Sequence, residues 1–315
     1  IDGSFFIFPH TKELKRIYGT TTNQNNSELV QAKGSILYDL LNHMVIDGIL
    51  APNKTGERQL AIQHLKYCTH TDLIIYDRGY PSFDFVYNHK KRDIQFVMRC
   101  KQEFNQITKD FIQSDLEDTL VEIKPTHDQS FDGLNYTKEE RLTVRFIKIK
   151  LDRGETEILM TGLLDQVLYP ISLFKDLYNR RWGIETFYNI LKNIIQVEKF
   201  TGYSPNVINQ DFFASLLIHN IQTMIIEELE EETAEKYKKR KYEYKINRNL
   251  SMGFMKHTIL HLFMNENPEA ILDKLKKLFI EHVVPIRPDR KFPRKVGKYR
   301  RRLKPPLMPN FKSTI

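Results

Sequence analysis

The sequence predicts an α/β protein in which a mixed sheet flanked by helices is interrupted by a β-rich segment and followed by a helical C-terminal region. Three observations support this class. Short runs of Ile, Val and Leu alternate with helical patterns in the first part of the chain. Strand patterns separated by Asp, Gly and Asn turns dominate the middle, and helical patterns follow. We therefore expect five segments, over residues 1–114, 115–170, 171–225, 226–285 and 286–315.

The first segment is expected to hold a hairpin and two strand–helix pairs. The hairpin pattern over 33–53 is rich in Ile and Leu, and by position its turn falls near Asn42, His43 and Met44. The run "DLIIYDRGYPS" (72–82) reads as a short buried strand that ends at an acid and a turn. The other elements expected here are helices over 56–68 and 82–93 and a strand over 94–101.

The later segments are expected to pass from strands to helices. Strands are predicted over 119–125, 141–151 and 156–164. Helices are predicted over 178–196, 206–243, 251–264 and 268–283. The sole tryptophan, Trp182, is expected to pack in the core.

Composition narrows the class of protein. The 315 residues can bury a sizeable core, and 41% hydrophobic content is typical of a globular chain. No apolar run reaches the roughly 18 residues that a membrane span needs, and no signal-peptide pattern opens the chain. Cys68 and Cys100 form no disulfide framework. These features predict a protein of the reducing cytoplasm.

Positive charge is concentrated at the C-terminal end. Residues 286–315 hold eleven Lys and Arg and one acid, whereas the other 285 residues hold 37 Lys and Arg and 39 Asp and Glu. Such a basic segment can bind phosphates, since each neutralised phosphate releases counterions. A plain solubilising tail is the alternative.

One stretch, "YNRRWGIETFYNILK" (178–192), places four polar groups at regular offsets. On a continuous α-helix at about 100° per residue, Tyr178, Arg181, Glu185 and Lys192 share a stripe about 60° wide opposite an apolar face. A solvated charged face is the routine reading of such a stripe. The alternative is that the stripe holds a carboxylate between cations that bind one ligand.

Two further acids stand out by context. Asp2 lies between an apolar residue and a Gly-Ser pair, and Asp77 follows a buried strand. Each is acceptable as a turn residue. If they converge with Glu185, three carboxylates would supply the oxygen ligands that Mg²⁺ prefers.

These motifs together resemble those of a known family. The spacing Y-x2-R-x3-E-x6-K looks like the signature of the DDE transposases of bacterial insertion sequences, in particular the insertion-sequence-4 family. "IDGS" resembles the first Asp motif of that family, and "IIYDRGYPS" resembles the second. "ILMTGLLD" (158–165) resembles the return from its β-rich insertion, and "RWGIETFYNILK" its Glu region. The order of the motifs also agrees over roughly residues 1–225.

The resemblance implies a ribonuclease-H-like core and cut-and-paste DNA transposition. Asp2, Asp77 and Glu185 would be catalytic and would hold two Mg²⁺ ions, with Mn²⁺ as a substitute, for phosphodiester hydrolysis and strand transfer. It also implies a homodimer on DNA, acting at transposon ends and target DNA in the bacterial cytoplasm and nucleoid. The residues expected to bind DNA phosphates are Tyr178, Arg181, Lys192 and Arg78.

Two other functions remain open from the sequence. A ribonuclease-H-like nuclease would share the acids and cut without strand transfer, and a domesticated protein would bind DNA without cutting it. The chain starts one residue before Asp2, so we expect most of the first core strand and any N-terminal DNA-recognition region to lie outside it.

Overall fold

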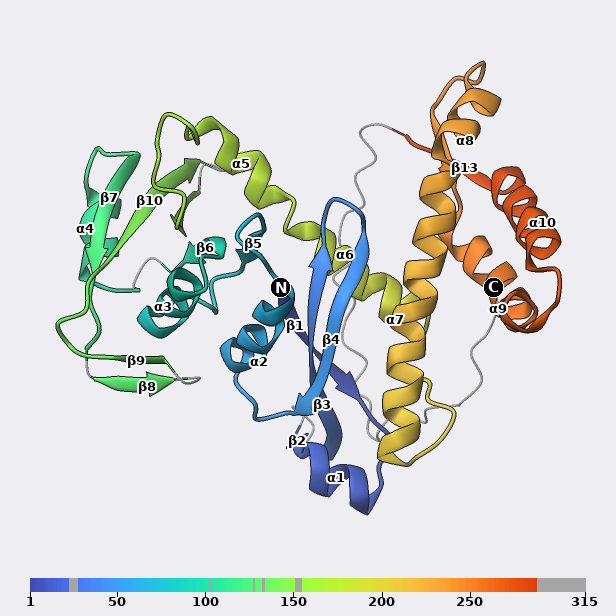
Figure 1. Cartoon of the computed structure of the whole chain (residues 1–315), viewed down its shortest axis with the longest axis horizontal. Coiled ribbons are helices and arrows are strands. Elements are labelled where there is room, and N and C mark those ends of the chain that lie inside the picture. Colours follow the sequence, from blue (N-terminus) through green and yellow to red (C-terminus); the bar gives the residue numbers. More distant parts are fainter. Residues whose placement is uncertain (23–27, 102–103, 127, 132–133, 151–154, 288–315) are drawn as a thin grey trace. The chain divides into compact units, whose positions relative to one another are not determined.

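The computed structural model describes residues 1–315 except 23–27, 102–103, 127, 132–133, 151–154 and 288–315 (Figure 1). The basic segment expected at 286–315 therefore lies almost wholly outside the described residues. The chain divides into two compact units, each built from several stretches. The first comprises Ile1–Phe5, Lys33–Leu41 and Ile46–Thr186, and the second comprises Phe6–Ala32, Asn42–Val45 and Phe187–Ile315.

The N-terminal strands form a four-stranded sheet in the order β1–β3–β2, with β4 paired to β3 (Figure 1). The expected hairpin is confirmed as β3 and β4, and its turn includes His43 at a φ of 54°. Asp2 is the first residue of β1. The bounds are β1 Asp2–Ile7, α1 Lys12–Tyr18, β2 Thr20–Thr22, β3 Glu28–Asp39 and β4 Met44–Pro52.

A five-stranded mixed sheet dominates the first unit, in the order β5–β6–β11–β10–β7. Strands β5 and β6 are parallel, and the other neighbours are antiparallel. The strands of the β-rich segment thus extend the sheet that β5 and β6 begin. The strand bounds are β5 Leu73–Tyr76, β6 Gln95–Cys100, β7 Asp118–Ile123, β10 Leu142–Lys150 and β11 Thr156–Thr161. The remaining elements of this part are α2 Glu57–His64, a 3₁₀ turn Leu65–Tyr67, α3 Phe83–Lys91, α4 Gln106–Gln113, β8 Gln129–Phe131 and β9 Leu134–Tyr136. An α/β class with a mixed sheet is confirmed.

Both faces of the sheet are buried at β5, β6 and β11, which explains why these strands contain the uninterrupted apolar runs LII, FVM and ILM. Alternate residues of one strand enter two different clusters. In β6, for example, Phe96 and Met98 join the cluster that includes Phe85 and Phe111, whereas Val97 joins the cluster on the other side. A strand buried on both sides cannot show the period of two that marks a half-exposed strand.

A buried histidine fixes α3 against β5. His89 Nδ1 donates to the Phe85 carbonyl at 2.7 Å, so Nε2 of the neutral ring accepts from the Tyr76 hydroxyl at 2.9 Å. Burial lowers the pKa of His89 to about 4, which keeps the ring neutral. Because Tyr76 is the last residue of β5, this bond also fixes the point at which Asp77 leaves the sheet.

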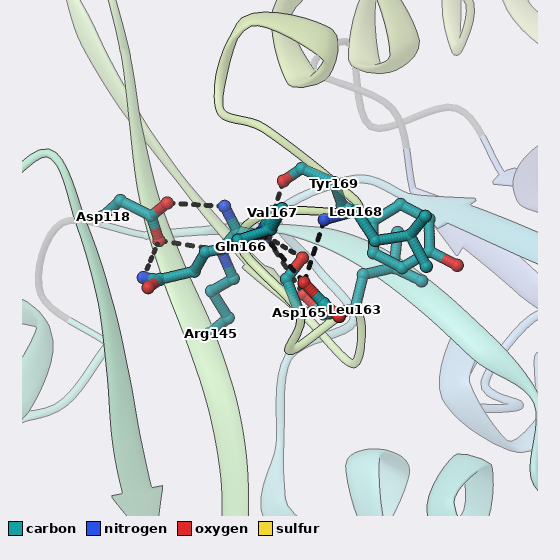
Figure 2. Close-up of polar contacts among 8 residues, drawn as sticks. All are labelled: Asp118, Arg145, Leu163, Asp165, Gln166, Val167, Leu168 and Tyr169. Carbon is teal, nitrogen blue, oxygen red and sulfur yellow. Dashed lines mark hydrogen bonds and ion pairs between the residues drawn. The ribbon is translucent and has the colours of Figure 1, made fainter.

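A buried arginine ties the connection after β11 to the sheet (Figure 2). The Arg145 side chain is fully buried, and it donates to the Asp118 carboxylate of β7 and to the Tyr169 carbonyl at 2.8 Å. It also reaches the Leu163 and Asp165 carbonyls. Burial of Asp118 disfavours its charge, but hydrogen bonds from Arg145 and Gln166 outweigh this and lower its pKa. The guanidinium therefore satisfies carbonyls that the non-regular segment leaves without strand partners.

The helix expected over 178–196 is interrupted. The structure has α5 at Ser172–Asn179, α6 at Trp182–Asn189 and a π-helical segment at Ile190–Ile194. Between α5 and α6 the backbone tightens to i,i+3 bonds, with the Gly183 nitrogen bonded to the Arg180 carbonyl at 2.9 Å. The single stripe computed from one helical period is therefore wrong. The core position expected for Trp182 is also wrong, because 53% of this residue is exposed.

Helices make up most of the second unit. The helix expected over 206–243 is divided into α7 Pro205–Glu228 and α8 Glu230–Tyr237, and the other two helices are confirmed as α9 Arg248–Met264 and α10 Pro268–Glu281. A short pair of strands, β12 Tyr244–Ile246 and β13 Val283–Pro285, was not expected. No helix in the described part of the chain is long and apolar enough to cross a membrane.

The Arg145–Asp118 pair generates the first prediction. Asp118→Asn should lower the free energy of unfolding by about 3 kcal/mol at neutral pH, because it leaves a buried guanidinium without its counter-charge. Since the pKa of Asp118 is lowered in the folded state, its contribution is present above the unfolded pKa and is lost as the pH falls through the folded pKa. Urea unfolding should therefore show that the difference in unfolding free energy between the parent protein and Asp118→Asn becomes smaller in acid. Asp115→Asn, at an exposed neighbouring acid, is the control, and equal stability of the two variants would contradict the assignment.

Candidate active site

Two of the predicted acids lie at neighbouring strand ends in the first unit. Asp2 is the first residue of β1, and Asp77 directly follows β5. The Ile1 nitrogen donates to the Ile75 carbonyl at 3.3 Å, which brings the start of β1 against β5. Burial raises the pKa of Asp2, and the negative charge of Asp77 adds to this rise. The fold therefore brings these two carboxylates, 75 residues apart in the numbering, into electrostatic contact.

Arg181 supplies the opposing charge. Its side chain is only 8% exposed, and its Nη2 donates to Glu185 Oε1 at 2.8 Å. The same charge lowers the pKa of Asp2 and interacts with Asp77. The Nε of Arg181 is buried without a hydrogen-bond partner among the described residues. One guanidinium thus faces all three acids of the predicted site.

Tyr178 completes the surroundings of Arg181. Its hydroxyl lies 3.4 Å from Asp77 Oδ1 as a hydrogen-bond donor, and the guanidinium carbon of Arg181 lies 5.8 Å from its ring centroid. Burial raises the pKa of Tyr178, so the phenol stays protonated. Tyr178, Arg181 and Glu185 therefore do gather with Asp77, although the regular helix that predicted their common face is interrupted.

Lys192 and Arg78 are placed differently from these residues. Lys192 belongs to the second unit, where its Nζ lies 4.9 Å from the Phe6 ring centroid. Burial lowers the pKa of Lys192, and Glu198 opposes this change. Arg78 is exposed beside Asp77. Exposure leaves the Arg78 side chain accessible to a ligand from solution.

Two residues that no sequence pattern marked lie in the same corner of the first unit. The carboxylate of Glu57, the first residue of α2, lies against Gly3 and Gly79, which belong to the two Asp motifs. The Tyr80 hydroxyl is buried near the same acids and has no hydrogen-bond partner among the described residues. A glutamate in the first turn of a helix is common, so no sequence signal distinguished Glu57.

The carboxylates of Asp2, Asp77 and Glu185 do not converge on a single point where one metal ion could contact all three. Among the described residues, no group of three His, Cys, Asp or Glu side chains is close enough to hold a metal ion directly. The Asp2–Asp77 pair nevertheless fits a hard cation, because their charges repel each other and their oxygens are suitable ligands. Glu185 is held by Arg181 and would have to exchange this partner to join them.

Comparisons with known proteins agree on one family. Residues 1–221 match the family described as "Transposase DDE domain". The chain is 26% identical over 230 residues to the transposase InsG for insertion sequence element IS4 of Escherichia coli strain K12, covering 70% of this chain and 50% of that protein. It is 21% identical over 324 residues to the transposase for insertion sequence element IS231C of Bacillus thuringiensis subsp. berliner, covering 89% and 66%. The chain thus spans half to two thirds of the length of these relatives.

A solved structure also resembles the chain. It is a cryo-EM structure of the piggyBac transposase synaptic complex with hairpin DNA, with 12% sequence identity and a TM-score of 0.46. The similarity covers 88% of this chain and 56% of that one.

The burial of the Asp2 carboxylate, with the charge of Asp77 as a smaller contribution, generates the second prediction. Because the pKa of Asp2 is raised in the folded state, ionised Asp2 destabilises the fold above that pKa, and the penalty fades as the pH falls through it. Asp2→Asn keeps an oxygen for the bond from the Gly3 nitrogen and should raise the unfolding temperature at neutral pH. This increase in unfolding temperature should become smaller in acid. Calorimetry in a chelating buffer measures it, with exposed Asp176→Asn as the control, and a lower unfolding temperature for Asp2→Asn would contradict the electrostatic account.

Proposed function

Because the chain belongs to the family of proteins with the transposase DDE domain, we propose that it is a DNA transposase that excises and transfers an insertion sequence. The observation that supports the proposal is the Arg181 guanidinium, which bonds to Glu185 and interacts electrostatically with Asp2 and Asp77. Carboxylates facing a phosphate-binding cation are the components that metal-dependent phosphoryl transfer requires.

Asp2 and Asp77 are the proposed direct ligands of Mg²⁺, with Glu185 as the third catalytic acid. Mg²⁺ is usually held by one or two carboxylates, several waters and substrate phosphates, which suits a site where three carboxylates are not gathered on one point. When bound, two such ions stabilise the charge on the attacking and leaving oxygens of the phosphodiester. Mn²⁺ is expected to substitute.

The cationic side chains have a separate role in the proposal. Arg181 and Tyr178 would contact the phosphates that flank the scissile bond, with Arg78 as an exposed third contact. A DNA phosphate offers Arg181 the same pair of oxygens as Glu185 does. An incoming phosphate can therefore replace Glu185 on the guanidinium and free that carboxylate for the catalytic site.

The partners follow from the same chemistry. We propose that the protein binds transposon ends and target DNA, that it acts as a homodimer on DNA, and that it works in the bacterial cytoplasm and nucleoid. The basic segment at 286–315 would add phosphate contacts. The enzyme alternative is a nuclease that shares the acids and lacks strand transfer, and the inactive DNA-binding protein is the other.

The deciding experiment uses purified protein, labelled DNA carrying the ends of its element, and Mg²⁺ or Mn²⁺. Cleavage followed by strand transfer into a target DNA supports the transposase. Cleavage alone supports the nuclease, and retention of the DNA without cleavage supports the inactive binding protein. A parallel reaction in chelator tests the requirement for a metal ion.

Glu185→Gln gives the third prediction. Cleavage should fall by about two to three orders of magnitude, a loss typical for one preorganised electrostatic group. DNA affinity should change by less than about tenfold, because the cations remain. Gel-based cleavage and fluorescence anisotropy measure the two effects separately, with Asp176→Asn as a matched acid-to-amide control on α5. Normal cleavage by Glu185→Gln would show that the catalytic acid is assigned wrongly.

Lys192→Ala gives the fourth prediction. If Lys192 contacts one DNA phosphate, its loss should weaken binding to all DNA sequences and reduce the slope of log affinity against log salt by about 1. Titration at several salt concentrations measures this slope. Lys239→Ala, at an exposed lysine of the same unit, controls for the general loss of positive charge. An unchanged slope for Lys192→Ala would remove Lys192 from the interface.

A further inference from the structure

Glu57 lies against the backbone of both Asp motifs. A Cβ atom added at Gly3 would lie 3.6 Å from Glu57 Oε1, and one added at Gly79 would lie 3.7 Å from Oε2. Gly3 directly follows Asp2, and Gly79 is two residues after Asp77. The two glycines therefore leave room for the Glu57 carboxylate beside the catalytic acids.

The fold holds Glu57 in this place. It is the first residue of α2, and Gly56 before it is extended, with φ −65° and ψ 136°. At the other end of α2, fully buried His64 donates to Asp47 of β4 at 2.7 Å, and its other nitrogen accepts from the Ser35 hydroxyl of β3 at 3.0 Å. The helix is thus fastened to two strands, and the position of its first residue follows from the core.

Tyr80 points to a ligand at the same place. Only 1% of the residue is exposed, and its hydroxyl has no hydrogen-bond partner among the described residues. Burial raises the pKa of Tyr80, and the charges of Asp2, Glu57 and Asp77 raise it further. An unsatisfied buried hydroxyl is destabilising, so its retention near three carboxylates needs an explanation.

The charges of this corner leave a need for cations. Lys33 Nζ lies 3.8 Å from Glu57 Oε1, and Arg181 faces Asp2 and Asp77. Two cationic side chains thus face the carboxylates of Asp2, Asp77, Glu57 and Glu185. A hydrated divalent cation would offset the remaining negative charge, and its waters would reach groups that do not contact the ion directly.

We propose that Glu57 is a fourth carboxylate of the divalent-cation site of Asp2 and Asp77, and that the Tyr80 hydroxyl hydrogen-bonds to a water of the bound ion. The inference rests on the proposed function, because it concerns the same site. Glu57 and Tyr80 act here as positioning residues. They orient the hydration shell, whereas Asp2 and Asp77 bind the ion.

A routine role for Glu57 makes a different prediction. An acid in the first turn of a helix interacts favourably with the helix dipole, and such a role does not affect metal binding. Glu269 occupies the first turn of α10 and is exposed. Glu269→Gln therefore removes the same charge from the first turn of a different helix, away from Asp2 and Asp77 in the sequence.

The test measures Mn²⁺ binding to the purified protein without DNA, by calorimetry and electron paramagnetic resonance. Glu57→Gln should weaken Mn²⁺ binding by about tenfold or more, the usual cost of losing a residue that orients a metal ligand. Tyr80→Phe should also weaken Mn²⁺ binding, while its unfolding temperature in chelator stays unchanged or rises because an unsatisfied hydroxyl is removed. Glu269→Gln should bind Mn²⁺ as the parent protein does.

Asp77→Asn separates this inference from the proposed function. If Asp77→Asn loses Mn²⁺ binding and both Glu57→Gln and Tyr80→Phe retain the parent affinity, the inference is wrong and the proposed cation site stands. If Asp77→Asn also retains the parent affinity for Mn²⁺, both the inference and the proposed cation site are wrong. If Glu57→Gln fails to fold in chelator, Tyr80→Phe decides the question by the same measurement.

Discussion

The burial of the Asp2 carboxylate at one corner of the first unit is the constraint on which the proposed site depends. Asp2 and Asp77 are brought together by neighbouring strand ends, and the pKa of Asp2 rises through burial and through the charge of Asp77. Arg181 offsets this repulsion while it also holds Glu185 at 2.8 Å. The same charges that disfavour folding are the ones that a divalent cation would stabilise.

Buried polar groups fix the elements that carry these acids. His89 joins α3 to the end of β5 just before Asp77, and His64 joins α2 to β3 and β4. Arg145 fastens the connection between β11 and α5 to the sheet (Figure 2). Each of these side chains makes two or more hydrogen bonds in a region that excludes water. Each therefore restricts the backbone around it to one arrangement. The proposed site thus lies on elements held by directional bonds as well as by apolar packing.

Much of the fold was accessible from the sequence because strands and helices were marked by apolar runs and turn residues. The β3–β4 hairpin and the strand that ends at Asp77 were predicted in this way. The interruption of the helix at 180–181 was not predictable, because its residues are good helix formers and the tighter turn is seen only in the folded backbone. Glu57 was missed for another reason: its neighbours Gly3 and Gly79 are distant in sequence, and only the fold brings them together.

The choice of arginine at position 181 has a consequence for how the proposed site changes when DNA binds. A guanidinium offers several N–H groups in a planar fork that suits carboxylate and phosphate equally, whereas an ammonium is a strongly hydrated point charge. Arg181 can therefore exchange Glu185 for a phosphate and keep its hydrogen bonds. In the proposed function, the arginine that neutralises the acids in the free protein would also bind the substrate, and release of Glu185 would follow from phosphate binding.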